Sequence, residues 1–170
     1  MPNRIEYRGF TASYSEPVSE LITPISILPI LAAGRESRSS PVEVQALWDT
    51  GATVTCMKPT LFERLKLRPL DTTNSEVFVG VGGEVTANLT LVNLLLAPNF
   101  EIEFCPIYVL VFPGDTDLLI GMDIIRMGDF AVCNAENKTS FSFAVPPFPD
   151  RINLADKAAA ANRLNNETTS

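Results

Sequence analysis

Apolar and polar residues alternate along much of this 170-residue chain. The alternation is regular at residues 42–48, 85–91 and 139–145, and a period of two is typical of strands with one buried face. Residues 107–112 form a continuous apolar run, which predicts a fully buried strand. Many short strands separated by turns predict an all-β domain whose sheet is closed, or nearly closed, into a barrel.

A few stretches break this pattern and predict helices. Pro59 is a residue favoured in the first turn of a helix, and Leu61 and Leu65 then lie on one apolar face. Residues 122–127 can form a second short helix, and the Ala-rich residues 150–164 can form a third. The helices are short, so strands are expected to dominate the fold.

The stretch before the first alternating strand is apolar but contains two prolines. Residues 21–32 include Pro24 and Pro29, which lack the N–H that a strand in the middle of a sheet donates. We therefore expect a strand at a sheet edge or at a bulge. This strand would form a hairpin with residues 42–48. Residues 1–20 are polar without a clear period, which fits either an arm or an edge strand.

Composition limits the kinds of partner. The chain is 46% hydrophobic, which is enough for a core, and its net charge of −7 comes without a basic cluster. An acidic chain of this kind argues against binding to nucleic acid or to an anionic membrane surface. No apolar run approaches 18 residues, and the first residues do not resemble a signal peptide. The three cysteines are widely spaced, which predicts reduced, buried thiols and a cytoplasmic location.

The chain contains no histidine, and this excludes several kinds of site. Ser-His-Asp and Cys-His catalysis both need an imidazole, and so do the common His-containing zinc sites. No Ser-x-x-Lys motif is present either. We therefore expect no metal and no cofactor, and carboxylate chemistry becomes the leading candidate.

Asp49 is the carboxylate in the most informative position. It follows the alternating strand at residues 42–48 and is followed by Thr50 and Gly51. A carboxylate on a tight turn at a strand end is held firmly, and the glycine allows another backbone to come close. The same triplet is also a common ordinary turn, so by itself it leaves both interpretations open.

Two further stretches bear on the choice. Residues 80–83, Gly-Val-Gly-Gly, stand between two predicted strands and indicate a hairpin with a mobile tip, although an ordinary hairpin has the same pattern. Residues 117–121 form a short, very apolar strand that ends in glycine before the second short helix. A strand, a turn and a short helix thus occur twice, which hints at internal pseudo-symmetry.

Together these stretches resemble the retropepsin-like, or retroviral-type, aspartic protease family. The matching motifs are Trp-Asp-Thr-Gly-Ala at residues 48–52, the glycine-rich residues 80–83 and Asp-Leu-Leu-Ile-Gly at residues 117–121. Their order and spacing also match, over about residues 21–145. The resemblance implies a closed, β-barrel-like retropepsin fold with one or two short helices, active as a two-fold homodimer on peptide or protein substrates.

The resemblance also implies roles for individual residues. Asp49 would be the catalytic residue, contributed once by each subunit, because the chain has a single Asp-Thr-Gly. The remaining expected site residues form an active-site loop, a substrate-binding flap and a second loop: Thr50, Gly51 and Ala52; Val81, Gly82 and Gly83; Ile120 and Gly121. Residues 1–20 would be an N-terminal arm, residues 21–145 the protease domain and residues 146–170 a Pro-rich, flexible C-terminal tail.

The chain departs from retroviral members at two positions. They often carry an acidic residue after the Ala and an Arg after the second Gly, whereas this chain has Thr53 and Met122. The corresponding ion pair near the dimer interface is therefore missing. Three hypotheses remain: an active homodimeric endopeptidase, a non-catalytic dimeric peptide-binding module with this fold, and a maturation protease that acts on its own precursor.

Overall fold

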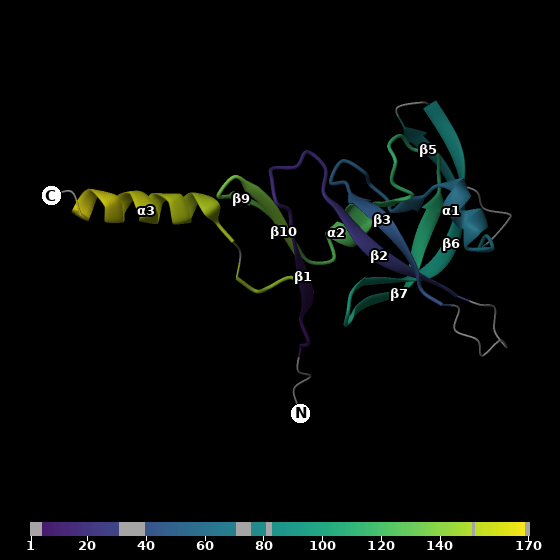
Figure 1. The fold of residues 1–170 in the computed structure, drawn as a ribbon, viewed down its shortest axis with the longest axis horizontal. Helices are drawn as coiled ribbons and strands as arrows, with labels where there is room; N and C mark the ends of the chain where they lie inside the picture. Colours follow the sequence, from purple (N-terminus) through teal and green to yellow (C-terminus); the bar gives the residue numbers. More distant parts are fainter. Residues whose placement is uncertain (1–4, 31–39, 71–75, 81–82, 151, 169–170) are drawn as a thin grey trace.

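The computed structural model describes residues 5–30, 40–70, 76–80, 83–150 and 152–168. Within these residues there are ten strands and three helices (Figure 1). In chain order they are β1 (Arg8–Ser13), β2 (Ile22–Pro29), β3 (Val42–Trp48), β4 (Cys56–Met57), α1 (Pro59–Arg64), β5 (Glu76–Gly80), β6 (Gly83–Ala97), β7 (Phe100–Val109), β8 (Leu118–Ile120), α2 (Met122–Ile125), β9 (Asp129–Ala135), β10 (Lys138–Val145) and α3 (Leu154–Thr168).

Six strands close into a barrel. They follow the order β2-β3-β8-β4-β7-β6, and β6 pairs again with β2 to complete the ring. Residues that face inward, such as Ile27, Leu94 and Ile107, are fully buried and form the core. The predicted all-β, barrel-like fold is confirmed. β5 continues the sheet beyond β6 and forms a hairpin with it.

The expectation that β2 lies at a sheet edge is wrong. β2 closes the barrel, because it pairs with β3 on one side and with β6 on the other. The two prolines are tolerated because each lies where β2 has only one partner. Pro24 lies opposite Gln45 of β3, before the pairing with β6 begins, and Pro29 lies opposite Val92 of β6, after the pairing with β3 has ended. The lack of an N–H group at the two prolines therefore does not have to remove a hydrogen bond between strands.

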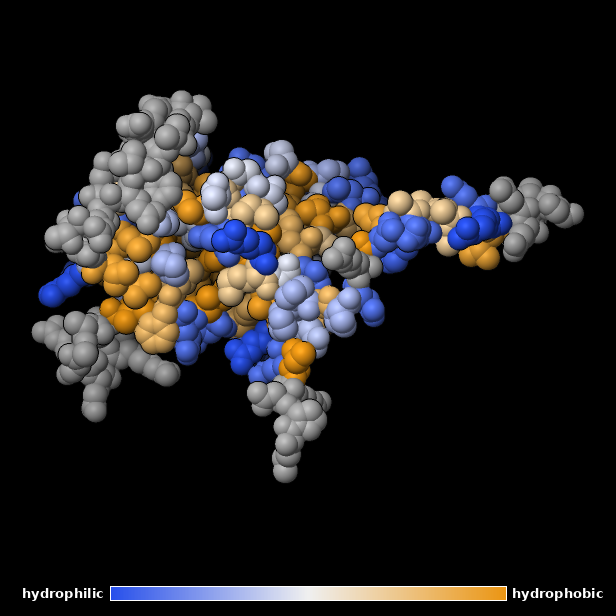
Figure 2. All heavy atoms as spheres, turned by 180° about the vertical axis from the view of Figure 1, so that it is seen from behind, coloured by the Kyte–Doolittle hydropathy of each residue, from blue (hydrophilic) through white to orange (hydrophobic). Residues whose placement is uncertain are grey.

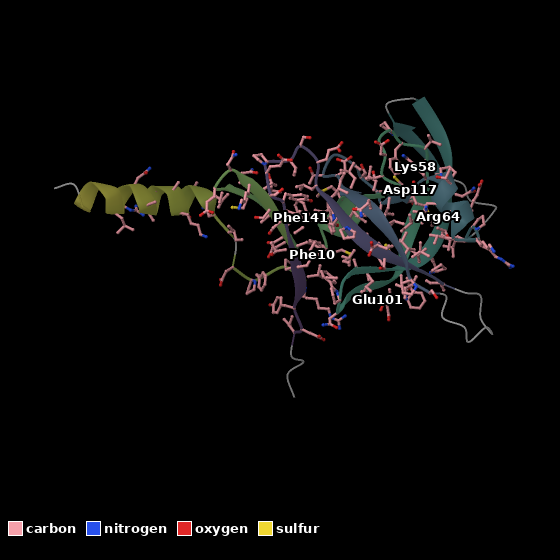
Figure 3. All side chains as sticks on the ribbon, in the orientation of Figure 1. Phe10, Lys58, Arg64, Glu101, Asp117 and Phe141 are labelled. Carbon is pink, nitrogen blue, oxygen red and sulfur yellow. The ribbon has the colours of Figure 1, made fainter. Side chains whose placement is uncertain are left out.

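A second sheet packs against the barrel. It contains three strands in the order β1-β10-β9, so the first 20 residues contribute an edge strand rather than only an arm. Phe10 of β1 and Phe141 of β10 lie between this sheet and the barrel (Figure 3). The predicted hairpin near the end of the chain is confirmed as β9 and β10.

Several boundaries differ from the predictions. The fully buried strand predicted at residues 107–112 is wrong, because β7 runs from Phe100 to Val109 and Val111, beyond its end, is 80% exposed. Register shifts near Asn93 and Leu96 interrupt the pairing of β7 with β6. α1 begins at Pro59 as predicted and ends at Arg64, so Leu65 of the predicted apolar face lies just after the helix. In the Ala-rich stretch, the Asn153 side chain caps α3 by accepting the N–H of Ala155 at 3.0 Å.

α3 projects away from the two sheets (Figures 1 and 2). Its residues up to Leu164 are exposed, including Leu154 at its start. Within the described part of the chain, no helix has the length and apolarity required to cross a membrane.

Candidate active site

Asp49 lies at the point where β3 ends and the chain turns. β8 lies between β3, which precedes this turn, and β4, which follows it. The backbone N–H of Asp49 donates to the carbonyl of Ile120 at the end of β8, with an N···O distance of 2.9 Å. The Asp49 loop, residues 49–52, is therefore attached to the barrel at its first residue.

The Asp49 side chain is fixed by its own turn. Its Oδ1 accepts the N–H of Gly51 at 2.8 Å, and its carbonyl accepts the N–H of Ala52 at 3.2 Å. This is the local side-chain-to-backbone bonding that aspartate favours in turns. Asp49 is half-buried, whereas Thr50 and Gly51 are exposed. The carboxylate is oriented by its own loop while part of it stays accessible.

The second loop is interlocked with the first. The N–H of Met122 donates to the carbonyl of Ala52 at 2.8 Å. Gly121 is needed here, because a Cβ at this position would lie within 3 Å of three backbone atoms of Val54. The structure thus brings Gly121 and Ile120 against the Asp49 loop, although the sequence places them some 70 residues apart.

Two polar residues that the sequence analysis did not single out connect the loops. Thr55 is fully buried; its hydroxyl donates to Asp123 Oδ1 at 2.7 Å and accepts the Gly121 N–H at 3.0 Å. Asp123 also accepts the backbone N–H of Thr55 at 2.8 Å and that of Ile124 at 2.9 Å. The only sequence signal was an aspartate in the first turn of α2, where a negative charge is favourable.

The predicted flap is described only in part. β5 and β6 form the expected antiparallel hairpin, with Gly80 opposite Gly83. Val81 and Gly82, which were expected to contact substrate, lie outside the described residues. Closure of the hairpin over a substrate therefore stays a prediction.

Cys56 lies on β4, close to the loops, but its chemistry does not suit a nucleophile. Burial, with smaller contributions from the charges of Asp123 and Asp49, raises the pKa of its thiol to about 12. A thiol in this state is almost wholly protonated near neutral pH, and the thiolate is the reactive form. Within the described residues, no group of three or more Cys, Asp or Glu side chains is arranged to hold a metal ion.

Asp49 lies outside the two surface grooves found among the described residues. One is lined by residues 6–9 and 97–100, and the other by parts of β1, β2, β3 and the β6–β7 turn. Neither groove is lined by residues 49–52.

Comparison with known families gives a direct result. Residues 40–127, more than half of the chain, match the model of a family described as gag-polyprotein putative aspartyl protease. The chain belongs to this family. The matched region includes the Asp49 loop, the β5–β6 hairpin and Gly121. These are the parts of the chain whose motifs resemble those of retropepsin-like proteases.

A solved structure supports the same fold. It is a retropepsin-like aspartic protease from Rickettsia conorii, 13% identical in sequence, with a TM-score of 0.51. The match covers 82% of this chain and 96% of the other, which confirms the retropepsin-like fold. Comparison with curated proteins gave no match.

Proposed function

We propose that this protein is an aspartic endopeptidase whose active site forms between two copies of the chain. The main observation in its favour is the position of Asp49. This residue is half-buried on a turn between β3 and β4, and its side chain accepts a hydrogen bond from the Gly51 N–H of the same turn. The intact Asp-Thr-Gly triplet and membership of an aspartyl protease family support it. A member that only bound peptides would need neither the carboxylate nor its supporting turn.

The requirement for two copies follows from the chemistry. Peptide hydrolysis of this type uses two carboxylates that share one proton. The chain contains a single Asp-Thr-Gly, and the loop that lies against it presents Ile120 and Gly121, which carry no charge. The second carboxylate is therefore assigned to Asp49 of a second subunit, related by a two-fold axis.

In this proposal the two carboxylates have different tasks. The charged one accepts a proton from a water molecule, which attacks the peptide carbonyl carbon, and the protonated one donates to the carbonyl oxygen. The Gly51 N–H, already bonded to Asp49 Oδ1, fixes the direction of that oxygen. Exposed Thr50 would bond across the axis and hold the paired loops together.

Further features of the proposal concern the rest of the chain. The β5–β6 hairpin, with Val81, Gly82 and Gly83 at or next to its tip, would close over the substrate and exclude water. Residues 146–170 would be a tail outside the protease domain. A cytoplasmic location is supported by the three cysteines, all in the described part of the chain and all free.

The proposal is tested by the cleavage of a peptide library. Purified protein is expected to cleave peptides in a pepstatin-sensitive manner, and Asp49→Asn is expected to have no activity while keeping the circular dichroism of the wild type. Cleavage by clean Asp49→Asn protein would show that another residue is catalytic. Peptide binding without cleavage by the wild type would favour the non-catalytic module.

A further inference from the structure

Trp48, the single tryptophan of the chain, directly precedes Asp49 and has an unusual set of contacts. Its side chain is 4% exposed, and its indole Nε1–H donates to Thr23 Oγ1 on β2 at 2.9 Å. Thr23 is itself 6% exposed. The backbone N–H of Trp48 donates to the carbonyl of Leu21 at 2.9 Å. Leu21, which precedes β2, therefore holds the backbone of Trp48, and Thr23 at the start of β2 holds its ring.

The second sheet surrounds the same ring. Four phenylalanine rings have centroids 5.2–5.9 Å from the centroid of the indole. They come from all three strands of that sheet: Phe10 of β1, Phe130 of β9, and Phe141 and Phe143 of β10. Phe10 and Phe141 are visible in Figure 3 between β1, β10 and the barrel.

These contacts differ in what they can fix. Packing of aromatic rings restricts where the indole lies, but it is weakly directional in comparison with a hydrogen bond. The indole has one N–H donor, so its single bond to Thr23 selects the orientation of the ring. Trp48 and Asp49 are joined by a planar, stiff peptide unit, so a displacement of the Trp48 backbone also displaces Asp49.

We infer that Trp48 and Thr23 are positioning residues, which hold the Asp49 loop from within the core. This inference rests on the proposed function of Asp49. It gives the N-terminal strand β1 a part in catalysis, because Phe10 packs on the ring that orients the loop. Residues 1–20 are then more than an arm attached to the protease domain.

The test removes the hydrogen bond while preserving the shape of the core. Thr23→Val keeps the side-chain volume and loses the acceptor, Thr23→Ser restores the acceptor, and Thr90→Val is a matched control elsewhere in the barrel. Thr90 is 1% exposed, and its hydroxyl donates to the carbonyl of Arg68 at 2.9 Å. The measurements are kcat and KM at a temperature where every variant is folded, with the active fraction titrated by a tight-binding inhibitor.

We expect Thr23→Val to lower kcat by about tenfold or more, because small displacements of reacting groups are costly, and to change KM by less than about twofold. Thr23→Ser should restore kcat to near the wild-type value, and Thr90→Val should leave both constants unchanged. Equal loss of kcat in Thr23→Val and Thr90→Val would overturn the inference, since it would then reflect a general loss of stability.

A second measurement does not depend on activity. The single indole N–H resonance reports whether the bond to Thr23 is made, and amide exchange at Gly51 reports the order of the Asp49 loop. Thr23→Val should shift the indole resonance and speed exchange at Gly51, whereas Thr90→Val should do neither. Unchanged amide exchange at Gly51 in Thr23→Val would refute the positioning role of Thr23, even if the protein cleaves no peptide. The failure of this inference can therefore be distinguished from the failure of the proposed protease function.

Discussion

Thr55→Val should lower the free energy of unfolding more than the small change in chemical structure suggests. Valine has nearly the same shape as threonine, so the fully buried site stays filled, but the hydroxyl is lost. The Gly121 N–H then has no acceptor, which costs about 1–3 kcal/mol for a buried donor. Loss of the bond to the Asp123 carboxylate costs a further ~1.5–3 kcal/mol, as is typical of hydrogen bonds to charged groups.

The two costs sum to about 2.5–6 kcal/mol, and because bonds in one network are not additive we take the middle of this range, about 3–5 kcal/mol, as the decrease in the free energy of unfolding. For a chain of 170 residues this corresponds to a Tm lower by about 6–20 °C. Thr55→Ser keeps the hydroxyl and loses one buried methyl group, so its cost should be about 1 kcal/mol. Thermal and urea unfolding at one fixed protein concentration measure both variants. If Thr55→Val is as stable as Thr55→Ser, the hydroxyl does not connect the two loops and the reasoning is refuted.

Other predictions concern glycines and thiols. Gly121→Ala should lower the free energy of unfolding, measured in urea, by more than about 2 kcal/mol, because the new Cβ would overlap backbone atoms. Gly51→Ala should lower it less, because its Cβ would meet only the Asp49 side chain. Equal losses of stability in the two variants would contradict this prediction. At pH 8 a thiol reagent should react quickly only with exposed Cys133 in the folded protein, because burial raises the pKa of the two buried cysteines to about 12. Rapid reaction of all three cysteines would contradict the burial of Cys56 and Cys105. Since unfolded thiols titrate near pH 9, the folded state retains more protons above this pH, and stability should fall as pH rises from about 9 towards 12. Gly82→Val should lower the turnover rate far more than it lowers the free energy of unfolding. A peptide inhibitor should slow hydrogen exchange at the tip of the β5–β6 hairpin, and an exchange rate that the inhibitor does not change would argue against a flap.

Much of the fold could be predicted because strand periodicity is a local property. The alternation in β3 and β10 is visible in the sequence, and both strands are present in the structure. The position of β2 could not be predicted, because whether a proline is tolerated depends on which side of the strand has a partner at that residue. β1 was ambiguous because the chain alternates there only briefly, with Phe10 and Ala12 packed against the core.

The candidate site divides in the same way. The Asp49 loop is bonded within itself, so a short motif was sufficient to predict it. The bond between Thr55 and Asp123 joins residues 68 positions apart, and that between Trp48 and Thr23 spans the β2–β3 hairpin. No local pattern distinguishes such a threonine from an ordinary strand residue, because its role depends on the partner that the fold brings to it.

The central claim is that each active site contains one Asp49 from each of two subunits, and a mixing experiment tests it most directly. Wild-type protein is equilibrated with an increasing excess of Asp49→Asn, and the cleavage rate is measured per wild-type subunit. If subunits exchange at random and mixed dimers are inactive, equal amounts should lower this rate to about half, and a ninefold excess should lower it to about one tenth. A rate per wild-type subunit that stays constant at every ratio would show that a single chain carries a complete active site, and would contradict the account.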